Sequence, residues 1–126
     1  MNIVDSSGWI EFFVDGQNAD VFTPLIMKLD QLIVPTIIFY EVYKKIALAQ
    51  DHEQAIEVVA HMQQAKYIVD IDPTAALEAA QCALEYKLAM ADSLIYSVAR
   101  KFKAVLWTQD VDFKNLPNVR YIEKKK

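Results

Sequence analysis

Four acidic residues spread over the chain have sequence neighbours that could bring their carboxylates together. Asp5 directly follows the apolar run 2–4, and Asp110 closely follows the apolar run 104–107. Asp92 stands at the start of one apolar helical pattern, and Glu41 lies in the first turns of another. Carboxylate oxygens are the ligands that the hard cations Mg²⁺ and Mn²⁺ prefer. The four acids are therefore candidate ligands of a divalent metal.

Convergence of these acids would itself require a cation. Two carboxylates about 4 Å apart repel by roughly 4 kcal/mol at an effective dielectric constant near 20. A cluster of four would destabilise the fold unless its members were protonated or held a metal. The sequence thus predicts Mg²⁺ or Mn²⁺ wherever the acids meet.

Each acid also has a purely structural explanation. Asp5 and Asp92 could simply cap helices. Glu41 precedes two lysines at helical spacing, which would give surface ion pairs worth a few tenths of a kcal/mol. Asp110 and its neighbour Asp112 could be ordinary turn residues. The prediction therefore depends on the convergence of the acids and not on any one of them.

Short apolar runs that alternate with longer helical patterns predict the elements that would position the acids. The runs expected to be strands are 2–4, 32–34, 67–69, 104–107 and, at an edge, 119–122. Continuous rather than alternating apolar residues favour a parallel sheet covered on both faces, and so a doubly wound α/β fold. In such sheets ligands bind outside the carboxyl ends of the strands, where Asp5 and Asp110 would lie.

Local signals mark where the helices should begin. Ser6 or Ser7 could cap the first helix, and Asp72 followed by Pro73 is typical of an N-cap and a first turn. Pro35 is placed where a first-turn proline would be tolerated.

Size and composition narrow the class of protein. The 126 residues fit a single domain, 1–126, with a frayed basic tail at 124–126. The net charge of −4 comes from 17 acids and 13 bases, so four metal-bound acids would leave the remainder neutral. One cysteine, no apolar span of membrane length and no basic leader favour the cytoplasm. Two glycines are too few for a Gly-rich phosphate loop.

Two further groups of residues suggest packing or partners. His52 and His61 lie nine residues apart on one predicted helix, so they face opposite sides, cannot share a metal and are expected at the surface. Trp9, Phe12 and Phe13 crowd another helix, so one of them could face a partner.

Taken in order, several short motifs resemble the PIN domain, and within it the VapC toxins of toxin–antitoxin pairs. These motifs are Val4-Asp5-Ser6-Ser7, Pro35 followed by Glu41, Ala91-Asp92, and Thr108-Gln109-Asp110-Val111-Asp112-Phe113. The resemblance covers essentially the whole chain. It departs from the family before Asp92, where small and proline residues are missing, and in having only two arginines.

The resemblance implies a three-layer α/β/α fold with a mainly parallel sheet of four to five strands, and a Mg²⁺- or Mn²⁺-dependent endoribonuclease. In this reading the catalytic and metal-binding acids are Asp5, Glu41, Asp92 and Asp110. Ser7, Thr108 and the more variable acid Asp112 would support them. The implied partners are RNA, a cognate antitoxin and a second copy of the chain, with no membrane.

Other functions stay open at this point. A PIN-domain nuclease of RNA processing would have the same residues as a toxin. A phospho-accepting receiver domain would need its acceptor near Asp70, and would leave Glu41 unexplained. A non-catalytic interaction module is the third alternative. For phosphate binding, Lys44, Lys45 and the pair Lys101/Lys103 are candidates, although solvated helix lysines would look the same.

Overall fold

The chain starts in the middle of its own sheet. The computed structural model describes residues 1–125, and its first strand, β1 (Asn2–Val4), is the central one. The other strands are β2 (Leu32–Pro35), β3 (Tyr67–Val69), β4 (Val105–Thr108) and β5 (Val119–Tyr121). Their order is β3-β2-β1-β4-β5, and every neighbouring pair is parallel.

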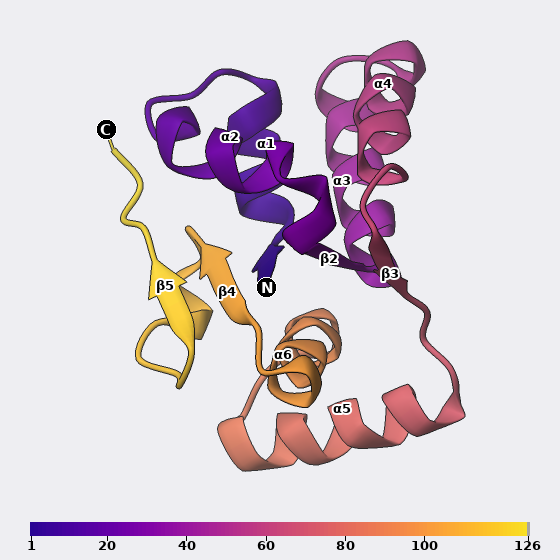
Figure 1. Ribbon diagram of the computed structural model, residues 1–126, viewed down its shortest axis with the longest axis vertical. Coiled ribbons are helices and arrows are strands. Elements are labelled where there is room, and N and C mark those ends of the chain that lie inside the picture. Colours follow the sequence, from indigo (N-terminus) through magenta and orange to yellow (C-terminus); the bar gives the residue numbers. More distant parts are fainter. Residues whose placement is uncertain (126) are drawn as a thin grey trace.

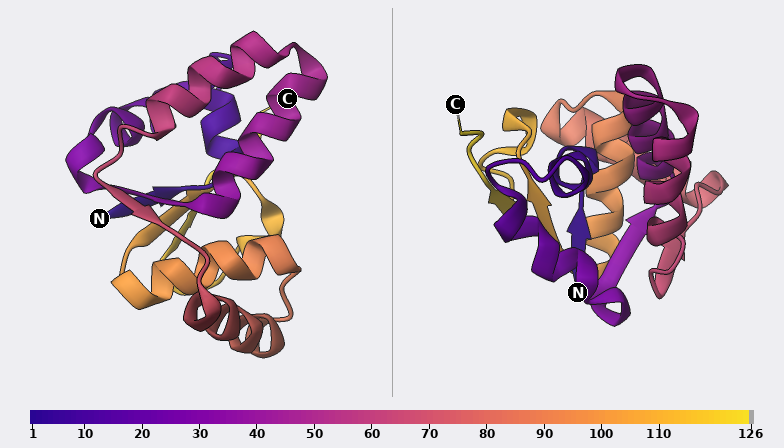
Figure 2. Two further views of the ribbon diagram at one scale, coloured as in Figure 1. Left: turned by 90° about the vertical axis from the view of Figure 1, so that its right-hand side faces the viewer. Right: turned by 90° about the horizontal axis from the view of Figure 1, so that it is seen from above.

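Helices cover both faces of this sheet, as Figures 1 and 2 show. One layer holds α1 (Ser6–Phe13), α2 (Ala19–Met27), α3 (Thr36–Ala49) and α4 (His52–Met62). The other holds α5 (Pro73–Tyr86) and α6 (Met90–Phe102), and the short helices η1 (Leu29–Gln31) and η2 (Val111–Phe113) lie in connections. The predicted three-layer α/β/α fold with a parallel sheet is confirmed.

The order of the strands places the site. From β1 the chain steps outward to β2 and β3 through α1–α4, and then returns through α5 and α6 to β4 on the opposite side of β1. The connections from β1 and β4 therefore diverge. In open α/β sheets such a switch point leaves a crevice at the carboxyl ends of the two strands. Asp5 follows β1 and Asp110 follows β4 at this position.

Burial explains why the central strands are continuously apolar. Ile3, Val4 and the first three residues of β2 are 0–1% exposed, because helices pack on both of their faces. The edge strand β3 differs, since Ile68 is 41% exposed. In α3 the residues Ile38 and Val42 point into the core, which sets the side of this helix that carries Glu41.

The ends of several helices differ from the prediction. Asp5, not Ser6 or Ser7, is the N-cap of α1 and accepts a hydrogen bond from the Gly8 amide. Pro35 closes β2 and occupies the N-cap position of α3, not its first turn. Asp72 caps α5 as predicted.

Helix α2 was not predicted. It contains Pro24 in its interior, where proline normally opposes helix formation, and its N-cap Asn18 makes no side-chain capping bond. No helix in the part of the chain that the structure describes is long and apolar enough to cross a membrane. Of the predicted frayed tail, Lys124 and Lys125 are exposed and without regular structure, and residue 126 lies outside the described residues.

Candidate metal-binding and active site

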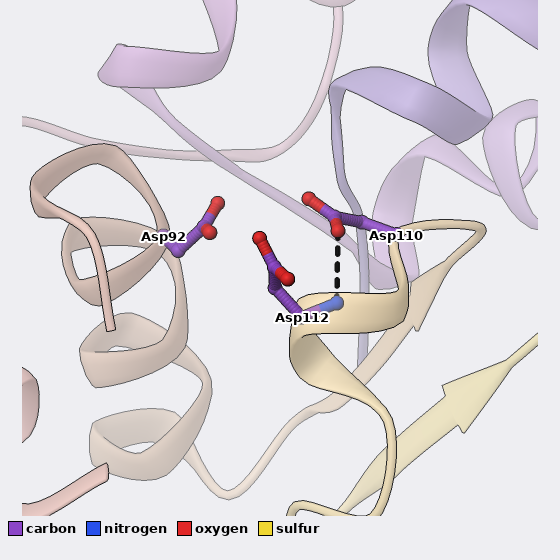
Figure 3. A group of neighbouring side chains, drawn as sticks. All are labelled: Asp92, Asp110 and Asp112. Atoms are coloured by element: carbon purple, nitrogen blue, oxygen red, sulfur yellow. Dashed lines mark hydrogen bonds between the residues drawn. The ribbon is translucent and has the colours of Figure 1, made fainter. Parts of the chain in front are cut away.

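Three carboxylates from two separate parts of the chain face one another beyond the carboxyl edge of the sheet. Asp92, Asp110 and Asp112 each offer an oxygen, and these oxygens all lie within 4.8 Å of one another. Figure 3 shows the three side chains converging from α6 and from the start of η2. An all-oxygen set at this spacing fits a hard divalent cation.

Local structure fixes each of these three acids. The helix α6 begins at Met90 with Ala89 as its N-cap, so Asp92 lies in the first turn and is not the cap itself. Asp110 is the N-cap of η2, and its Oδ1 accepts a hydrogen bond of 2.9 Å from the Asp112 amide. This turn directs Asp112 toward Asp92, which makes a residue predicted only as a supporting one a member of the closest group.

Asp5 lies beside this group but is bound differently. It is 2% exposed, and both of its oxygens accept short hydrogen bonds. Oδ1 accepts from the Ser7 hydroxyl at 2.6 Å and from the Gly8 amide at 3.2 Å, while Oδ2 accepts from the Thr108 hydroxyl at 2.6 Å. The helix cap considered for this residue is therefore real, and it is formed by a carboxylate that also connects β1 to β4.

The two hydroxyl groups pass this connection on to the backbone after β4. The Thr108 Oγ1 accepts a hydrogen bond from the Asp110 amide at 2.8 Å. The Ser7 Oγ accepts one from the Gln109 amide at 2.9 Å. Ser7 and Thr108, which were predicted as supporting residues, thus link Asp5 to the segment that carries Asp110.

Glu41 is half-buried on α3, and its Oε1 is buried without a hydrogen-bond partner. The alternative explanation required ion pairs to Lys44 or Lys45. Within residues 1–125 the ion pairs are instead Arg100–Glu85 and Lys101–Glu78, on α5 and α6. Glu41 is therefore not held by a surface salt bridge, and its buried oxygen remains available to a ligand.

Electrostatics links all five acids. Burial raises the pKa of Asp92, and the charges of the other four acids add to this, which together bring it to about 7. In order of decreasing effect these acids are Asp110, Glu41, Asp112 and Asp5. Burial also raises the pKa of Asp5 to about 6, against the lowering effect of its hydrogen bonds. The pKa of Glu41 is raised chiefly by burial, and next by the charge of Asp5 among the acids.

The residues present fit a divalent metal. The protein alone does not neutralise the negative charge of this site. Three observations indicate this: the three converging carboxylates, the buried Glu41 oxygen that has no donor, and the raised pKa of Asp92. A bound cation would remove this penalty, since a positive charge favours the ionised form of each carboxyl group. The structure brings Asp92 and Asp110 together, and it places Asp5 and Glu41 within their electrostatic reach.

Sequence reasoning missed a second buried network behind the site. The Asn18 side chain is 2% exposed, and its Nδ2 donates to Gln109 Oε1 at 2.6 Å and to the Glu123 carbonyl at 2.9 Å. Gln109 lies 91 positions from Asn18 in the sequence, and Glu123 lies 105 positions from it. No local sequence pattern could therefore reveal this network. A buried amide network of this kind holds the loop after β4 in place.

One histidine prediction was wrong. His61 is half-buried against the rings of Trp9 and Phe12, and is not a surface residue, because its helix α4 contacts α1 there. Trp9 is fully buried and Phe12 is partly buried against the core. His52 is exposed, as predicted.

Fold and site together define a class, an α/β domain that collects acidic side chains at the switch point of a parallel sheet. The sequence matches the PIN domain over residues 3–119, and the chain belongs to this family. Membership of the family implies nuclease activity. In the comparison with curated proteins, no match was found.

Solved structures similar to this chain include a toxin–antitoxin complex and a toxin. A toxin–antitoxin complex from Klebsiella pneumoniae is 21% identical with a TM-score of 0.77, covering 98% of this chain and 99% of that one. VapC20 from Mycobacterium tuberculosis, a sarcin–ricin loop cleaving toxin, is 15% identical with a TM-score of 0.75, covering 95% and 99%. FitAcB from Neisseria gonorrhoeae is 22% identical with a TM-score of 0.65, covering 89% of each chain. At these identities the likeness concerns the fold.

Proposed function

We propose that this protein is a divalent-metal-dependent endoribonuclease, and that it acts as the VapC-type toxin of a toxin–antitoxin pair. The convergence of Asp92, Asp110 and Asp112 supports the enzymatic part most directly. Similarity to toxins of known fold supports the biological part.

Asp92, Asp110 and Asp112 would hold the metal, either Mg²⁺ or Mn²⁺. When bound, such a metal lowers the pKa of a water molecule and stabilises the charge that develops on a phosphate. The unpartnered Oε1 of Glu41 would accept a hydrogen bond from an attacking water and hold its proton.

Asp5 contributes to the same site through the backbone. Its carboxylate accepts the Thr108 hydroxyl, and the same hydroxyl oxygen accepts the Asp110 amide. Asp5 thereby fixes the direction of Asp110, while its own negative charge adds to the attraction for a cation. This assigns it to the metal site as a neighbouring charge and a positioning residue.

The expected partners are an antitoxin and a second copy of the chain. On α3 the side chains of Tyr40 and Leu48 are 60% and 85% exposed. They border an apolar groove of about 730 Å³ between α3 and α4. An apolar surface of this kind is typical of a protein interaction site, which supports a protein partner.

RNA cleavage by the purified protein tests the enzymatic part. With Mn²⁺ or Mg²⁺ the protein should cleave RNA, and EDTA should abolish the cleavage. Asp110→Asn should lose at least about 100-fold in rate, because it removes one charge from the metal group. The matched control is Asp70→Asn, an exposed acid after β3 that the receiver-domain alternative would require instead. Cleavage that survives in Asp110→Asn and fails in Asp70→Asn would refute the assignment.

The toxin role needs a separate test in cells. Expression of the protein should arrest growth, Asp110→Asn should not, and the product of a small adjacent gene should relieve the arrest. Active enzyme without growth arrest would favour RNA processing instead.

A further inference from the structure

A hollow of about 260 Å³ next to the acidic site is lined by three lysines from two distant parts of the chain. Lys45 comes from α3, whereas Lys124 and Lys125 come from the segment after β5. The remaining lining residues are Ser7, Ile10, Glu11 and Gln109.

The hollow and the acidic site share a wall. Ser7 lines the hollow, and its hydroxyl donates to Asp5 at 2.6 Å. Gln109 also lines it and directly precedes Asp110 in the chain. Lys45 is close enough to the site for its charge to lower the pKa of Glu41. An RNA strand that lies across the acids could therefore enter the hollow without leaving the site.

The segment that supplies two of the lysines is held in place by hydrogen bonds at Ile122 and Glu123. The Ile122 amide donates to the Thr108 carbonyl at 2.8 Å, and Asn18 Nδ2 donates to the Glu123 carbonyl at 2.9 Å. Figure 1 shows this segment leaving β5 and running toward the side of the molecule where α1 and α2 lie. Lys124 and Lys125 therefore follow a segment that is bound beside the site.

Charge in the hollow is unbalanced. Lys45, Lys124 and Lys125 form none of the ion pairs among residues 1–125, which are Arg100–Glu85 and Lys101–Glu78. The single acid of the lining, Glu11, accepts a hydrogen bond from the Asn18 amide at 3.0 Å. The hollow thus gathers an excess of positive charge beside five carboxylates that would repel a polyanion.

We propose that this hollow binds a backbone phosphate of the RNA strand, adjacent to the phosphate that is cleaved at the acidic site. The proposal rests on the nuclease function proposed above. Ammonium groups bind phosphate as point charges and tolerate any base sequence. The lysines offset the repulsion between RNA and the acids, which accounts for RNA binding by a chain of net charge −4.

Binding of a fluorescein-labelled, random-sequence 20-nucleotide RNA tests the proposal by fluorescence anisotropy. Full-length protein carrying Asp92→Asn serves as the non-cleaving background. The test variant adds Lys45→Ala, Lys124→Ala and Lys125→Ala. The control variant adds Lys28→Ala, Lys66→Ala and Lys103→Asn, which removes equal charge just ahead of β2, β3 and β4, at the opposite edge of the sheet. Asparagine is chosen at 103 because this residue has a left-handed backbone.

The test variant should bind about tenfold or more weakly than the background, and the control within about twofold. The slope of log Kd against log salt should flatten by about 0.7 in the test variant, because one phosphate contact on a single strand contributes roughly 0.7 to this slope. Arginine at the same three positions should restore both values. In the cleaving protein, the test substitutions should raise KM and leave kcat nearly unchanged.

Failure of this inference is distinguishable from failure of the nuclease proposal. If the wild-type protein cleaves RNA with Mn²⁺ while the test and control variants bind alike, the phosphate site is overturned and the nuclease stands. If the wild-type protein cleaves no RNA, the nuclease proposal itself fails. Equal loss of affinity for a polyglutamate peptide would overturn the assignment to RNA and favour an acidic protein partner.

Discussion

Two sets of carboxylates meet at the carboxyl edge of this sheet, and they are built in opposite ways. Asp5 is almost fully buried and gives both oxygens to donors of the protein. Asp92, Asp110 and Asp112 face one another instead. Within the described residues, only the Asp110 carboxylate of these three accepts a hydrogen bond, and its donor is the Asp112 backbone amide. In the first arrangement, charge-assisted hydrogen bonds offset part of the cost of burying the Asp5 carboxylate. The second stores repulsion that an external cation would relieve.

This difference bears on which acids belong to folding and which to chemistry. The hydrogen bonds of Asp5 connect β1 to β4 whether or not a metal is bound, so the loss of one of them should cost stability. A carboxylate surrounded by other carboxylates lowers the stability of the metal-free protein. Substitutions in the two sets should therefore change activity and stability in different proportions, from large effects to small ones.

The largest expected effect is on cleavage in Asp92→Asn. RNA cleavage with Mn²⁺ should fall by at least about 100-fold, because the variant removes a metal ligand and a charge. Urea unfolding in EDTA should show a free energy of unfolding no lower than that of the wild type, since a repelling charge is gone. Added Mn²⁺ should raise the Tm of the wild type and not that of the variant. A variant that is both inactive and clearly unstable would place Asp92 with Asp5.

Thr108→Val tests the hydrogen bonds that hold the buried Asp5 carboxylate. The substitution removes the hydroxyl that donates a hydrogen bond to Asp5 and accepts one from the Asp110 amide. The buried Asp5 carboxylate then lacks one of its donors. The free energy of unfolding should fall by roughly 2–4 kcal/mol, the cost of lost bonds to a charged group and an unsatisfied amide. Thr74→Val, at an exposed position of α5, is the control in the same urea titrations. Equal stability of both variants would contradict the comparison.

Asn18→Ala examines the network behind both sets. It leaves the Gln109 side-chain Oε1 and the Glu123 backbone carbonyl without their donor, at a cost of about 1–2 kcal/mol in the free energy of unfolding. Cleavage by the folded variant should fall less than in Asp92→Asn, because the metal ligands remain. Gln17→Ala, the exposed neighbour, should change neither quantity. An Asn18 variant with unchanged stability would mean that the loop after β4 is held by Asp5 alone.

The sequence sufficed for the features that depend on local pattern. Apolar runs located all five strands, and the acids that follow β1 and β4 could be placed at one sheet edge from the rules of parallel sheets. Local pattern could not choose between Asp5 and the serines as the cap of α1, because the choice depends on Thr108 donating from 103 positions away. The closeness of Asp112 to Asp92 depends on the turn of η2, and α2 forms in spite of Pro24 because its apolar face is buried.

The smallest expected effect is the pH dependence of the difference between Asp92→Asn and the wild type in EDTA. The pKa of Asp92 is raised from 3.8 to about 7, so between these values the folded state binds more protons than the unfolded state. Stability contributed by this group therefore falls as pH rises, and the fall is complete above the folded pKa. Asparagine cannot ionise, so the variant should gain about 1 kcal/mol over the wild type at pH 8, a figure reduced for the partial exposure of Asp92. At pH 5 most of that gain should be gone. Urea unfolding of both proteins from pH 5 to 8 measures this, and a gain that grows toward acid pH would show that burial and the neighbouring acids do not raise the pKa of Asp92 in the folded state.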